Sequence, residues 1–420
     1  MNRAPPLAEA LRTAAEVIAG VLSGRAADSA LAAAVPPGAL RAATMELAYP
    51  TLRSFGRGDF LLGCLVERPL RAPTTRGLLL AALERLEARP DQAHTIVDQA
   101  VEAAALNRGR HKALVNGVLR SFLRRRDELL ARADADDVAR WRHPPWWIRR
   151  VQRDHPDRWE GILTAGNSRP PMTLRVNCRR ISGADYVARL DADGIAASPH
   201  GDSAVRLDKP VPVERLPGFA EGLCSVQDFA AQAAAGLLDV AAGMRTLDAC
   251  AAPGGKAAHL LERADLSLLA LDADANRARR IEDNLRRLGL AADVRVADAR
   301  ALDTWWDGRP FDRILADVPC SASGVVRRHP DAKWLRRESD IAGFAATQAA
   351  IVDALWRTLV PGGKMLYATC SVFAEENARQ VEAFVGRHAD ARLLTPVAAR
   401  TLELPDAEHD GLYYALLEKA

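Results

Sequence analysis

The stretch RTLDACAAPGGK, residues 245–256, joins a short strand-like run to a loop with two adjacent glycines. Gly254 and Gly255 allow a ligand to approach the backbone closely. A helix predicted after the loop would direct its unpaired N–H groups at that ligand. The stretch has neither the spacing of a P-loop nor the G-x-G-x-x-G dinucleotide fingerprint. We therefore predict a ligand-binding loop of another kind at the end of a strand.

Strand-like and helical runs alternate around this loop over the C-terminal half of the chain. The predicted strands are RTLDA (245–249), LSLLALDA (266–273), ADVRVAD (292–298), FDRILADVP (311–319) and GGKMLYATCS (362–371). Helices are predicted in NRARRIEDNLRRLG (276–289) and IAGFAATQAAIVDALWRTL (341–359). This rhythm is typical of a doubly wound parallel sheet, so residues 236–420 are predicted to form a Rossmann-like α/β domain.

Acidic residues end three of the predicted strands: Asp272, Asp298 and Asp317. One carboxylate at a strand end is more often a helix cap or a surface group than a ligand. Ligands of open α/β sheets bind beyond the carboxyl ends of the strands, where these three residues would gather. Together with the Gly-Gly loop they fit a nucleoside cofactor without a triphosphate, and S-adenosylmethionine is the leading candidate.

Two cysteines, Cys320 and Cys370, end neighbouring apolar runs and are predicted to face one site. The six cysteines contain no C-x-x-C pair, which argues against zinc and a disulfide framework, and we expect no metal. Cys64, Cys178 and Cys224 are interpreted as packing residues.

The first part of the chain places apolar residues at helical spacing and is predicted to be an all-helical domain over residues 1–135. ARADADDVAR (131–140) and the following HPPWW (143–147) are interpreted as a linker, because two prolines interrupt a helix. A small α+β subdomain is predicted over 145–235. Its strands are MTLRVN (172–177) and AVRLDKPVPVERLP (204–217), and its helix is ADYVARLDADG (184–194).

Charge is uneven along the chain, although the net charge is only +3. Residues 1–130 carry 18 Lys and Arg against 13 Asp and Glu, and residues 236–420 carry 24 against 27. An excess of positive charge at the front fits a polyanionic partner, although a solvated helical surface would look similar. Candidate phosphate contacts are Arg108, Arg110, Lys112, Arg120, Arg124, Arg125 and Arg126, and also Arg327, Arg328 and His329.

The N-terminal apolar stretch is interrupted by Glu9, Arg12 and Glu16, so it predicts neither a secretion signal nor a membrane span. We expect a cytoplasmic monomer without a membrane partner.

In order along the chain, DACAAPGGK, LDAD, VADAR, DVPCSASGVVRRHPDAKW and YATCSVFAEEN resemble the successive motifs of the RNA cytosine-5 methyltransferases of the Sun/Fmu (RsmB-like) family. LNRGRHKALVNGVLRSFLRR (106–125) resembles the NusB-type RNA-binding domain of the bacterial small-subunit member. The resemblance implies an S-adenosylmethionine-dependent methyltransferase domain preceded by an all-α NusB-like domain and an RRM-like α+β subdomain. It implies 16S rRNA as substrate, before small-subunit assembly is complete.

The resemblance also implies roles for single residues. Cys370 would be the nucleophile, Cys320 would assist release, and Asp317 would bind the cytosine. The residues implied to line the cofactor site are Cys250, Ala251, Ala252, Pro253, Gly254, Gly255, Lys256, Asp272, Asp298 and Asp317.

Three other functions remain open from the sequence. One is methylation of tRNA, and another is a non-catalytic NusB-type RNA-binding or antitermination protein, against which the intact cysteines speak. The third is methylation of DNA, whose enzymes attack with the cysteine of a Pro-Cys motif such as Pro319-Cys320. The second cysteine, Cys370, favours the RNA enzymes. A thiolate that adds to C6 makes C5 of cytosine nucleophilic, which is the chemistry that all these methyltransferases need.

Overall fold

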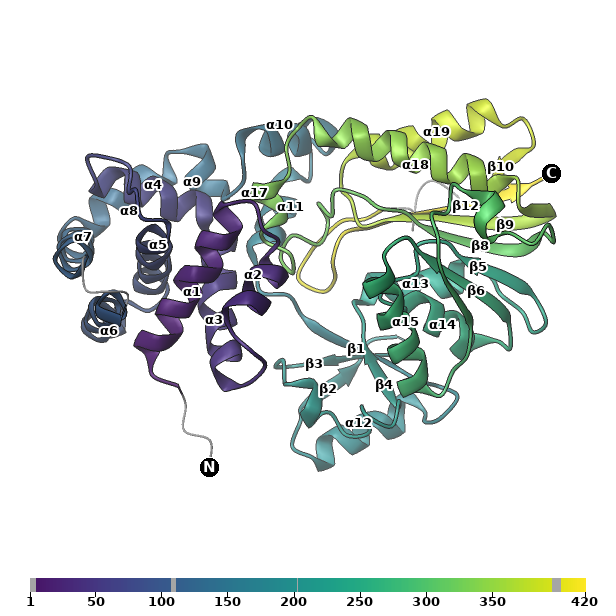
Figure 1. Ribbon diagram of the computed structural model, residues 1–420, viewed down its shortest axis with the longest axis horizontal. Coiled ribbons are helices and arrows are strands. Elements are labelled where there is room, and N and C mark those ends of the chain that lie inside the picture. The colour runs from purple at the N-terminus through teal and green to yellow at the C-terminus, as the bar shows by residue number, and fades with distance from the viewer. Residues whose placement is uncertain (1–4, 107–110, 202, 395–401) are drawn as a thin grey trace. The chain divides into compact units, whose positions relative to one another are not determined.

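The computed structural model describes residues 5–106, 111–201, 203–394 and 402–420, and this part of the chain divides into two compact units (Figure 1). The first unit consists of Met1–Arg169 and Val326–Glu338. The second consists of Pro170–Val325 and Ser339–Ala420. The chain therefore leaves the second unit directly after the DVPCSASG motif, contributes one segment to the first unit, and returns.

The first unit is helical, as predicted for residues 1–135, and it also includes residues 136–169 and 326–338. Its helices are α1 (Leu7–Leu22), α2 (Ala27–Ala34), α3 (Ala39–Arg53), α4 (Phe55–Leu65), α5 (Pro73–Ala88), α6 (Ala93–Leu106), α7 (Lys112–Arg124), α8 (Arg126–Asp134), α9 (Asp137–Trp141), α10 (Pro145–Asp154), α11 (Trp159–Asn167) and α17 (Ala332–Leu335), with a 3-10 turn η1 (Pro90–Gln92). The linker prediction was wrong, because residues 131–147 lie largely in α8, α9 and α10. Pro145 begins α10 at a position where the N–H that proline lacks would have no partner anyway.

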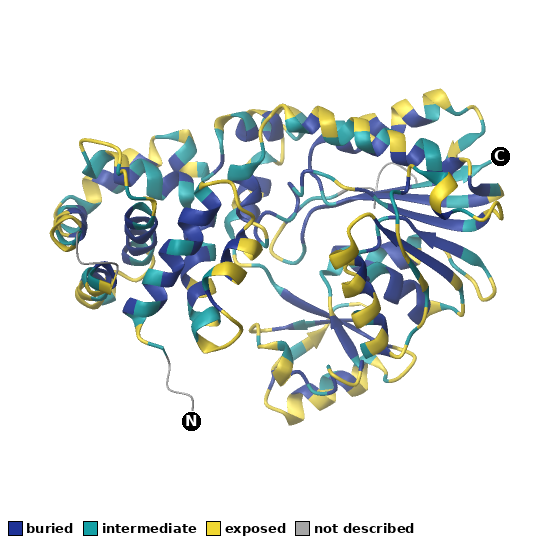
Figure 2. Ribbon diagram, viewed as in Figure 1, coloured by how far each residue is buried: buried dark blue, intermediate teal, exposed yellow. Residues whose placement is uncertain are grey.

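Helix α5 lies at the centre of this unit, since every residue from Gly77 to Leu83 is buried (Figure 2). Helix α1 approaches it very closely. A Cβ atom at Gly77 would lie only 2.5 Å from the carbonyl oxygen of Ala15. Glycine is therefore required at this crossing, because any side chain would push the two helices apart.

The segment that returns to the helical unit packs into its interior. The carboxylate of Asp331 accepts a hydrogen bond of 2.9 Å from the backbone N–H of Ala27. The indole N–H of Trp334 donates to the carbonyl of Leu52 at 3.0 Å, and its ring meets that of Phe55 edge-on at 4.7 Å. The residues that follow the Pro-Cys motif are therefore integral to the helical unit.

The second unit begins with a small antiparallel sheet in the order β2-β3-β1-β4. Its elements are β1 (Met172–Val176), α12 (Gly183–Ala192), β2 (Ala197–Pro199), β3 (Ala204–Leu207), η2 (Val213–Arg215) and β4 (Cys224–Val226). The strand predicted over residues 204–217 ends at Leu207, since Pro210 and Pro212 cannot donate to a ladder. β2 and β4 were not predicted.

The large sheet has the order β10-β12-β9-β8-β5-β6-β7, with β11 paired to β12. Its strands are β5 (Arg245–Asp248), β6 (Ser267–Asp272), β7 (Asp293–Val296), β8 (Phe311–Asp317), β9 (Leu359–Thr369), β10 (Ala391–Leu393), β11 (Leu402–Glu403) and β12 (Leu412–Lys419). Strands β5 to β9 pair in parallel, which confirms the predicted sheet, whereas β12 runs antiparallel to β9 and was not predicted.

Helices cover both faces of the large sheet, so the sheet is doubly wound (Figure 1). One face carries α18 (Asp340–Trp356) and α19 (Ala378–Arg387); the other carries α13 (Phe229–Leu237), α14 (Gly255–Arg263) and α15 (Ala275–Leu288). Two short elements, α16 (Leu302–Trp305) and η3 (Ala374–Glu376), complete the unit.

Candidate active site

The two cysteines meet at the carboxyl ends of neighbouring strands. Strands β8 and β9 are parallel neighbours, and Asp317 at the end of β8 is in register with Ala368 of β9. Cys320 lies three residues beyond Asp317, and Cys370 directly follows β9. Their sulfur atoms are 3.3 Å apart. The structure therefore brings the two predicted thiols into direct contact.

Cys320 is held in its protonated form. The hydrogen bond to Cys370 raises the pKa of Cys320 well above its ordinary value, and burial and the nearby Glu376 carboxylate act in the same direction. Cys370 does not lie at the N-terminus of a helix, because η3 begins at Ala374 and α19 begins at Ala378.

Lys256 and Asp317 form an ion pair beside the cysteines, with 2.5 Å between Nζ and Oδ2. Burial acts to lower the pKa of Lys256, but the Asp317 carboxylate, Tyr414 and Cys370 together outweigh it and raise the pKa. The lysine therefore remains an ammonium group near both Asp317 and Cys370. Oδ1 of Asp317 has no hydrogen-bond partner among the described residues and is available to a ligand.

The Gly-Gly loop follows β5, which is the neighbour of β8, and therefore lies at the same edge of the sheet. Gly254 has φ of +94° and directly precedes the first residue of α14. A Cβ atom at Gly254 would lie 3.1 Å from the Cα of Ile281, so the loop and α15 are in close contact. Ala251 anchors the loop, since its N–H donates to the carbonyl of Leu271 at 2.7 Å. Cys250 packs beneath the loop, where burial and Asp317 raise the pKa of its thiol.

Asp272 and Asp298 differ in what they bind. The Asp272 carboxylate is 4% exposed and accepts hydrogen bonds from the N–H groups of Ala252 (3.3 Å) and Asp274 (3.0 Å), so it supports the Gly-Gly loop. The side chain of Asp298 is 42% exposed and is held in a two-pronged contact by Arg300. Both lie at the predicted sheet edge.

Asp248, which the sequence prediction missed, lies at the end of β5 between these groups. It is 1% exposed, and neither carboxylate oxygen has a hydrogen bond of ordinary geometry within the described chain, although the Cys250 N–H lies near enough to favour the anion slightly. Burial raises the pKa of Asp248 to about 8, and the neighbouring Asp317 adds to the rise. A buried carboxylate without donors beside a glycine loop fits a ligand that carries a positive charge, as S-adenosylmethionine does.

The other predicted residues are scattered or committed elsewhere. Cys224 is buried and receives a hydrogen bond from Tyr186, whereas Cys178 is exposed rather than packed. Arg327 is 1% exposed and its carbonyl accepts a hydrogen bond from Arg53, so it supports the helical unit rather than a bound nucleotide.

Of the predicted phosphate contacts, Lys112, Arg120 and Arg124 are exposed on α7. Arg125 forms an ion pair with Glu128. Arg108 and Arg110 lie outside the described residues.

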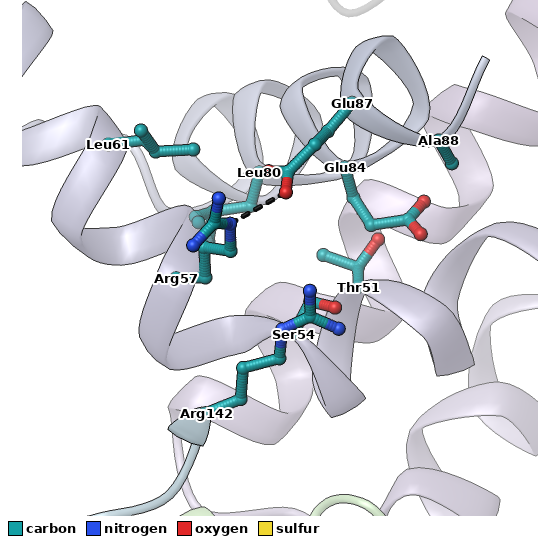
Figure 3. Close-up of a pocket in the computed structure, with 10 residues that line it drawn as sticks. Thr51, Ser54, Arg57, Leu61, Leu80, Glu84, Glu87, Ala88 and Arg142 are labelled. Atoms are coloured by element: carbon teal, nitrogen blue, oxygen red, sulfur yellow. Dashed lines mark hydrogen bonds and ion pairs between the residues drawn. The ribbon is translucent and has the colours of Figure 1, made fainter. Parts of the chain in front are cut away.

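A separate cavity of about 260 Å³ lies in the helical unit, lined by charged side chains (Figure 3). Arg57 binds Glu87 at 2.6 Å on one side, and Glu84 and Arg142 lie on the other. Burial raises the pKa of Glu84 to about 7. These residues lie in the first unit, so this cavity is distinct from the strand ends that carry the cysteines.

Neither a metal cluster nor a membrane span was found. Over the described ranges, no three His, Cys, Asp or Glu residues are grouped so as to hold a metal ion. None of the helices in those ranges is long and apolar enough to cross a membrane.

Comparison with known proteins extends over nearly the whole chain. The family model described as 16S rRNA methyltransferase RsmB/F matches residues 235–418, a model of the RsmF/B-like ferredoxin-like domain matches 143–214, and a NusB family model matches 9–124. Ribosomal RNA small subunit methyltransferase B of Serratia proteamaculans is 46% identical over 389 residues, which are 90% of each chain. The chain belongs to the RsmB/F family of 16S rRNA methyltransferases. The family resemblance and the fold class inferred from the motifs are thus confirmed.

Another relative and two solved structures are also similar to this chain. Ribosomal RNA small subunit methyltransferase B of Escherichia coli O6:H1 is 45% identical over 90% of each chain. A methyltransferase homolog protein from Pyrococcus horikoshii has a TM-score of 0.59 and 27% identity, over 67% of this chain and 97% of that one. The crystal structure of PH0851 has a TM-score of 0.81 over the whole of both chains, and at 24% identity this likeness shows the fold alone.

Proposed function

We propose that this chain transfers a methyl group to C5 of a cytosine in 16S rRNA, with S-adenosylmethionine as the donor. The observation that carries the proposal is the pair of thiols at 3.3 Å beside the Asp317–Lys256 ion pair. C5 of cytosine is a poor nucleophile until a thiolate adds to C6, so the reaction needs a thiolate, a proton carrier and a group that binds the ring. This site contains candidates for all three.

Cys370 is the proposed nucleophile. Its sulfur forms a bond to C6, and the electron pair of the C5–C6 double bond then becomes available at C5. After C5 has gained the methyl group, the C5 proton passes to water, the C5–H electron pair forms the C5–C6 double bond again, and the Cys370 sulfur departs with the electron pair of its bond to C6. The protonated state of Cys320 supports its proposed role in the later steps, because its thiol can donate to the departing sulfur of Cys370.

Asp317 is proposed to bind the base. Lys256 occupies its Oδ2 atom, which leaves Oδ1 to accept a hydrogen bond from the N4 amino group of cytosine. This contact would orient the ring above the two thiols while C6 is attacked.

The Gly-Gly loop and the acidic strand ends are proposed to hold the cofactor. S-adenosylmethionine would supply the methyl group from its sulfonium centre. Gly254, Gly255 and the first N–H groups of α14 would allow its close approach, and Asp248 would face its positive charge. Asp272 and Asp298 are proposed to accept hydrogen bonds from the ribose hydroxyl groups, with Asp272 also supporting the loop.

The substrate is tested by bisulfite sequencing of rRNA and tRNA after incubation with the purified protein and S-adenosylmethionine, with Cys370→Ala as the inactive control. We expect one protected cytosine in 16S rRNA and none in tRNA. Protection confined to tRNA would contradict the rRNA proposal. Parallel reactions with naked 16S rRNA and with assembled small subunits should favour the naked RNA if the target is modified before assembly is complete.

A further inference from the structure

A single buried carboxylate connects the two loops that carry the cysteines. Glu376 in η3 is fully buried and accepts four hydrogen bonds. Oε1 accepts from the backbone N–H of Ser321 at 2.8 Å and from Nε2 of Gln348 at 3.1 Å. Oε2 accepts from the hydroxyl groups of Ser321 at 2.5 Å and Ser371 at 2.6 Å.

The positions of these donors are specific. Ser321 is the residue after Cys320, and Ser371 is the residue after Cys370. Gln348 also donates to the carbonyl of Pro319 at 3.0 Å, so the residues on both sides of Cys320 are held.

Three more hydrogen bonds complete the connection. The backbone N–H of Gly324 donates to the carbonyl of Cys370 at 2.8 Å, and the N–H of Val372 donates to the hydroxyl of Ser323 at 2.9 Å. Asn377, next to Glu376, donates to the carbonyl of Ser371 at 2.8 Å. Each cysteine loop is thus bonded to the other and to η3.

We infer that Glu376 is a positioning residue that holds the Cys320 and Cys370 loops at one fixed separation, so that Cys370 reaches C6 of the ring while the Cys320 thiol stays within reach of the Cys370 sulfur. The effect of Glu376 on catalysis rests on the proposed function, whereas its effect on the separation of the two loops does not. Stability alone does not account for such a network, because well-packed apolar residues often stabilise an interior as well as buried charges do. A shift of about 1 Å between reacting groups can cost about 100-fold in rate.

The inference predicts different effects for two substitutions of the same residue. Glu376→Ala leaves four donors without an acceptor and frees the loops, so kcat should fall by about 100-fold with little change in KM for RNA. Glu376→Gln retains one acceptor oxygen for Ser321 and Gln348, and its amide can donate to the two hydroxyl groups. It should keep kcat within about tenfold of the parent. Glu382→Gln, an exposed change of the same type on α19, is the matched control and should have no effect.

The distance between the thiols can be measured without RNA or cofactor. Diamide oxidises two thiols to a disulfide and takes up their two electrons and two protons, and the rate depends on how the sulfur atoms are placed. We expect the parent, Glu376→Gln and Glu382→Gln to form the Cys320–Cys370 disulfide at similar rates, and Glu376→Ala to do so at least about tenfold more slowly. Peptide mass spectrometry would identify the bond.

The outcomes separate this inference from the proposed function. If Glu376→Ala cross-links as fast as the parent, the positioning inference is wrong, whatever its methylation rate. If cross-linking slows but the parent does not methylate RNA, the inference stands and the proposed function fails. If Glu376→Ala does not fold, Ser371→Ala replaces it. This variant removes only one of the four hydrogen bonds and should slow cross-linking by a smaller factor, and no slowing would overturn the inference.

Discussion

Glu376 and Lys333 are buried ionisable side chains that bind two successive segments of the chain after β8. Glu376 is surrounded by hydrogen-bond donors, whereas Lys333 is surrounded by acceptors. Glu376 holds the stretch around Ser321 in the second unit and meets four donors. Lys333 holds the stretch Val326–Glu338 in the first unit and is fully buried. Its ammonium group meets three neutral oxygens, the carbonyls of Arg53 (2.9 Å) and Arg142 (3.0 Å) and Oδ1 of Asn167 (2.8 Å).

The positive charges near Lys333 disfavour its protonated form, whereas the groups around Glu376 donate hydrogen bonds to it. Burial lowers the pKa of Lys333 well below its ordinary value, and the guanidinium groups of Arg142 and Arg53 lower it further. One side of Arg142 faces the cavity of Figure 3. The comparison shows that a buried lysine can be held by hydrogen bonds to neutral oxygens, because Lys333 joins three separate parts of the helical unit without an ion pair to any carboxylate among the described residues.

The largest expected effect follows from removal of residues 1–130. The positive charge excess of this region predicts weaker salt-dependent RNA binding after truncation. The structure predicts more, since the returning segment would lose its contacts with Ala27, Leu52, Arg53 and Phe55. Trypsin should then cleave after Lys333 at least about 100-fold faster than in the full chain, where this residue is buried. Equal protection in both proteins, measured by mass spectrometry, would show that the returning segment does not depend on the helices.

Lys333→Met tests the three hydrogen bonds of Lys333 within the first unit, and its expected effect is smaller than that of the truncation. The substitution keeps most of the side-chain volume but leaves three buried oxygens without their donor, so it should lower the free energy of unfolding by about 3 kcal/mol. Urea unfolding of both proteins measures the change. Lys209→Met, at an exposed lysine, is the control and should change the free energy by less than about 0.5 kcal/mol. A stable Lys333→Met protein would mean that the burial cost of the charge outweighs its three hydrogen bonds.

Asp248 extends the comparison to a buried carboxyl group to which the described residues supply no hydrogen-bond donor of ordinary geometry. Its pKa of about 8 lies above the ordinary value of 3.8, so between these values the folded state binds the proton that the unfolded state has lost. Stability contributed by this group should therefore fall as the pH rises from about 4 to 8, by up to about 1.4 kcal/mol for each pH unit. Asp248→Asn should remove this part of the slope in urea unfolding at several pH values. Identical slopes in both proteins would contradict the assignment.

Exposed cations should show the smallest effect. Lys112 and Arg120 lie on the surface of α7, where each could neutralise one phosphate. Lys112→Gln and Arg120→Gln should each reduce the slope of log affinity against log salt concentration by about 1, with weaker binding for all RNA sequences. Arg392→Gln, on the exposed part of the second unit, is the matched control. Unchanged slopes in all three variants would remove α7 from the RNA-binding surface.

Sequence patterns predicted the parts of the fold that local spacing determines. The five parallel strands and the helical unit follow from apolar periodicity. The antiparallel strand β12 was missed because its pairing with β9 depends on a contact between distant segments, which no local pattern contains. The start of α10 was not predicted, because proline interrupts the interior of a helix but is compatible with its first position.

The residues of the site likewise divide into those that local sequence patterns predicted and those that they did not. Cys320, Cys370, Asp272, Asp298 and Asp317 were found because each ends a strand of the parallel sheet or follows one within three residues. Glu376 and Gln348 were missed, since their partners come from distant loops and Gln348 lies in a helix that is otherwise rich in alanine. Asp248 could have been found, because it ends a predicted strand like the other acidic residues.

The assignment of Cys370 as nucleophile and Cys320 as the releasing residue is tested most directly by denaturing gels of the two alanine variants with 16S rRNA and S-adenosylmethionine. Cys370→Ala cannot form the bond to C6 and should give no protein band shifted by RNA. Cys320→Ala should still add to the ring and accept the methyl group but release slowly, so a shifted band that survives SDS should accumulate. A shifted band from Cys370→Ala, together with none from Cys320→Ala, would reverse the two roles and contradict this account.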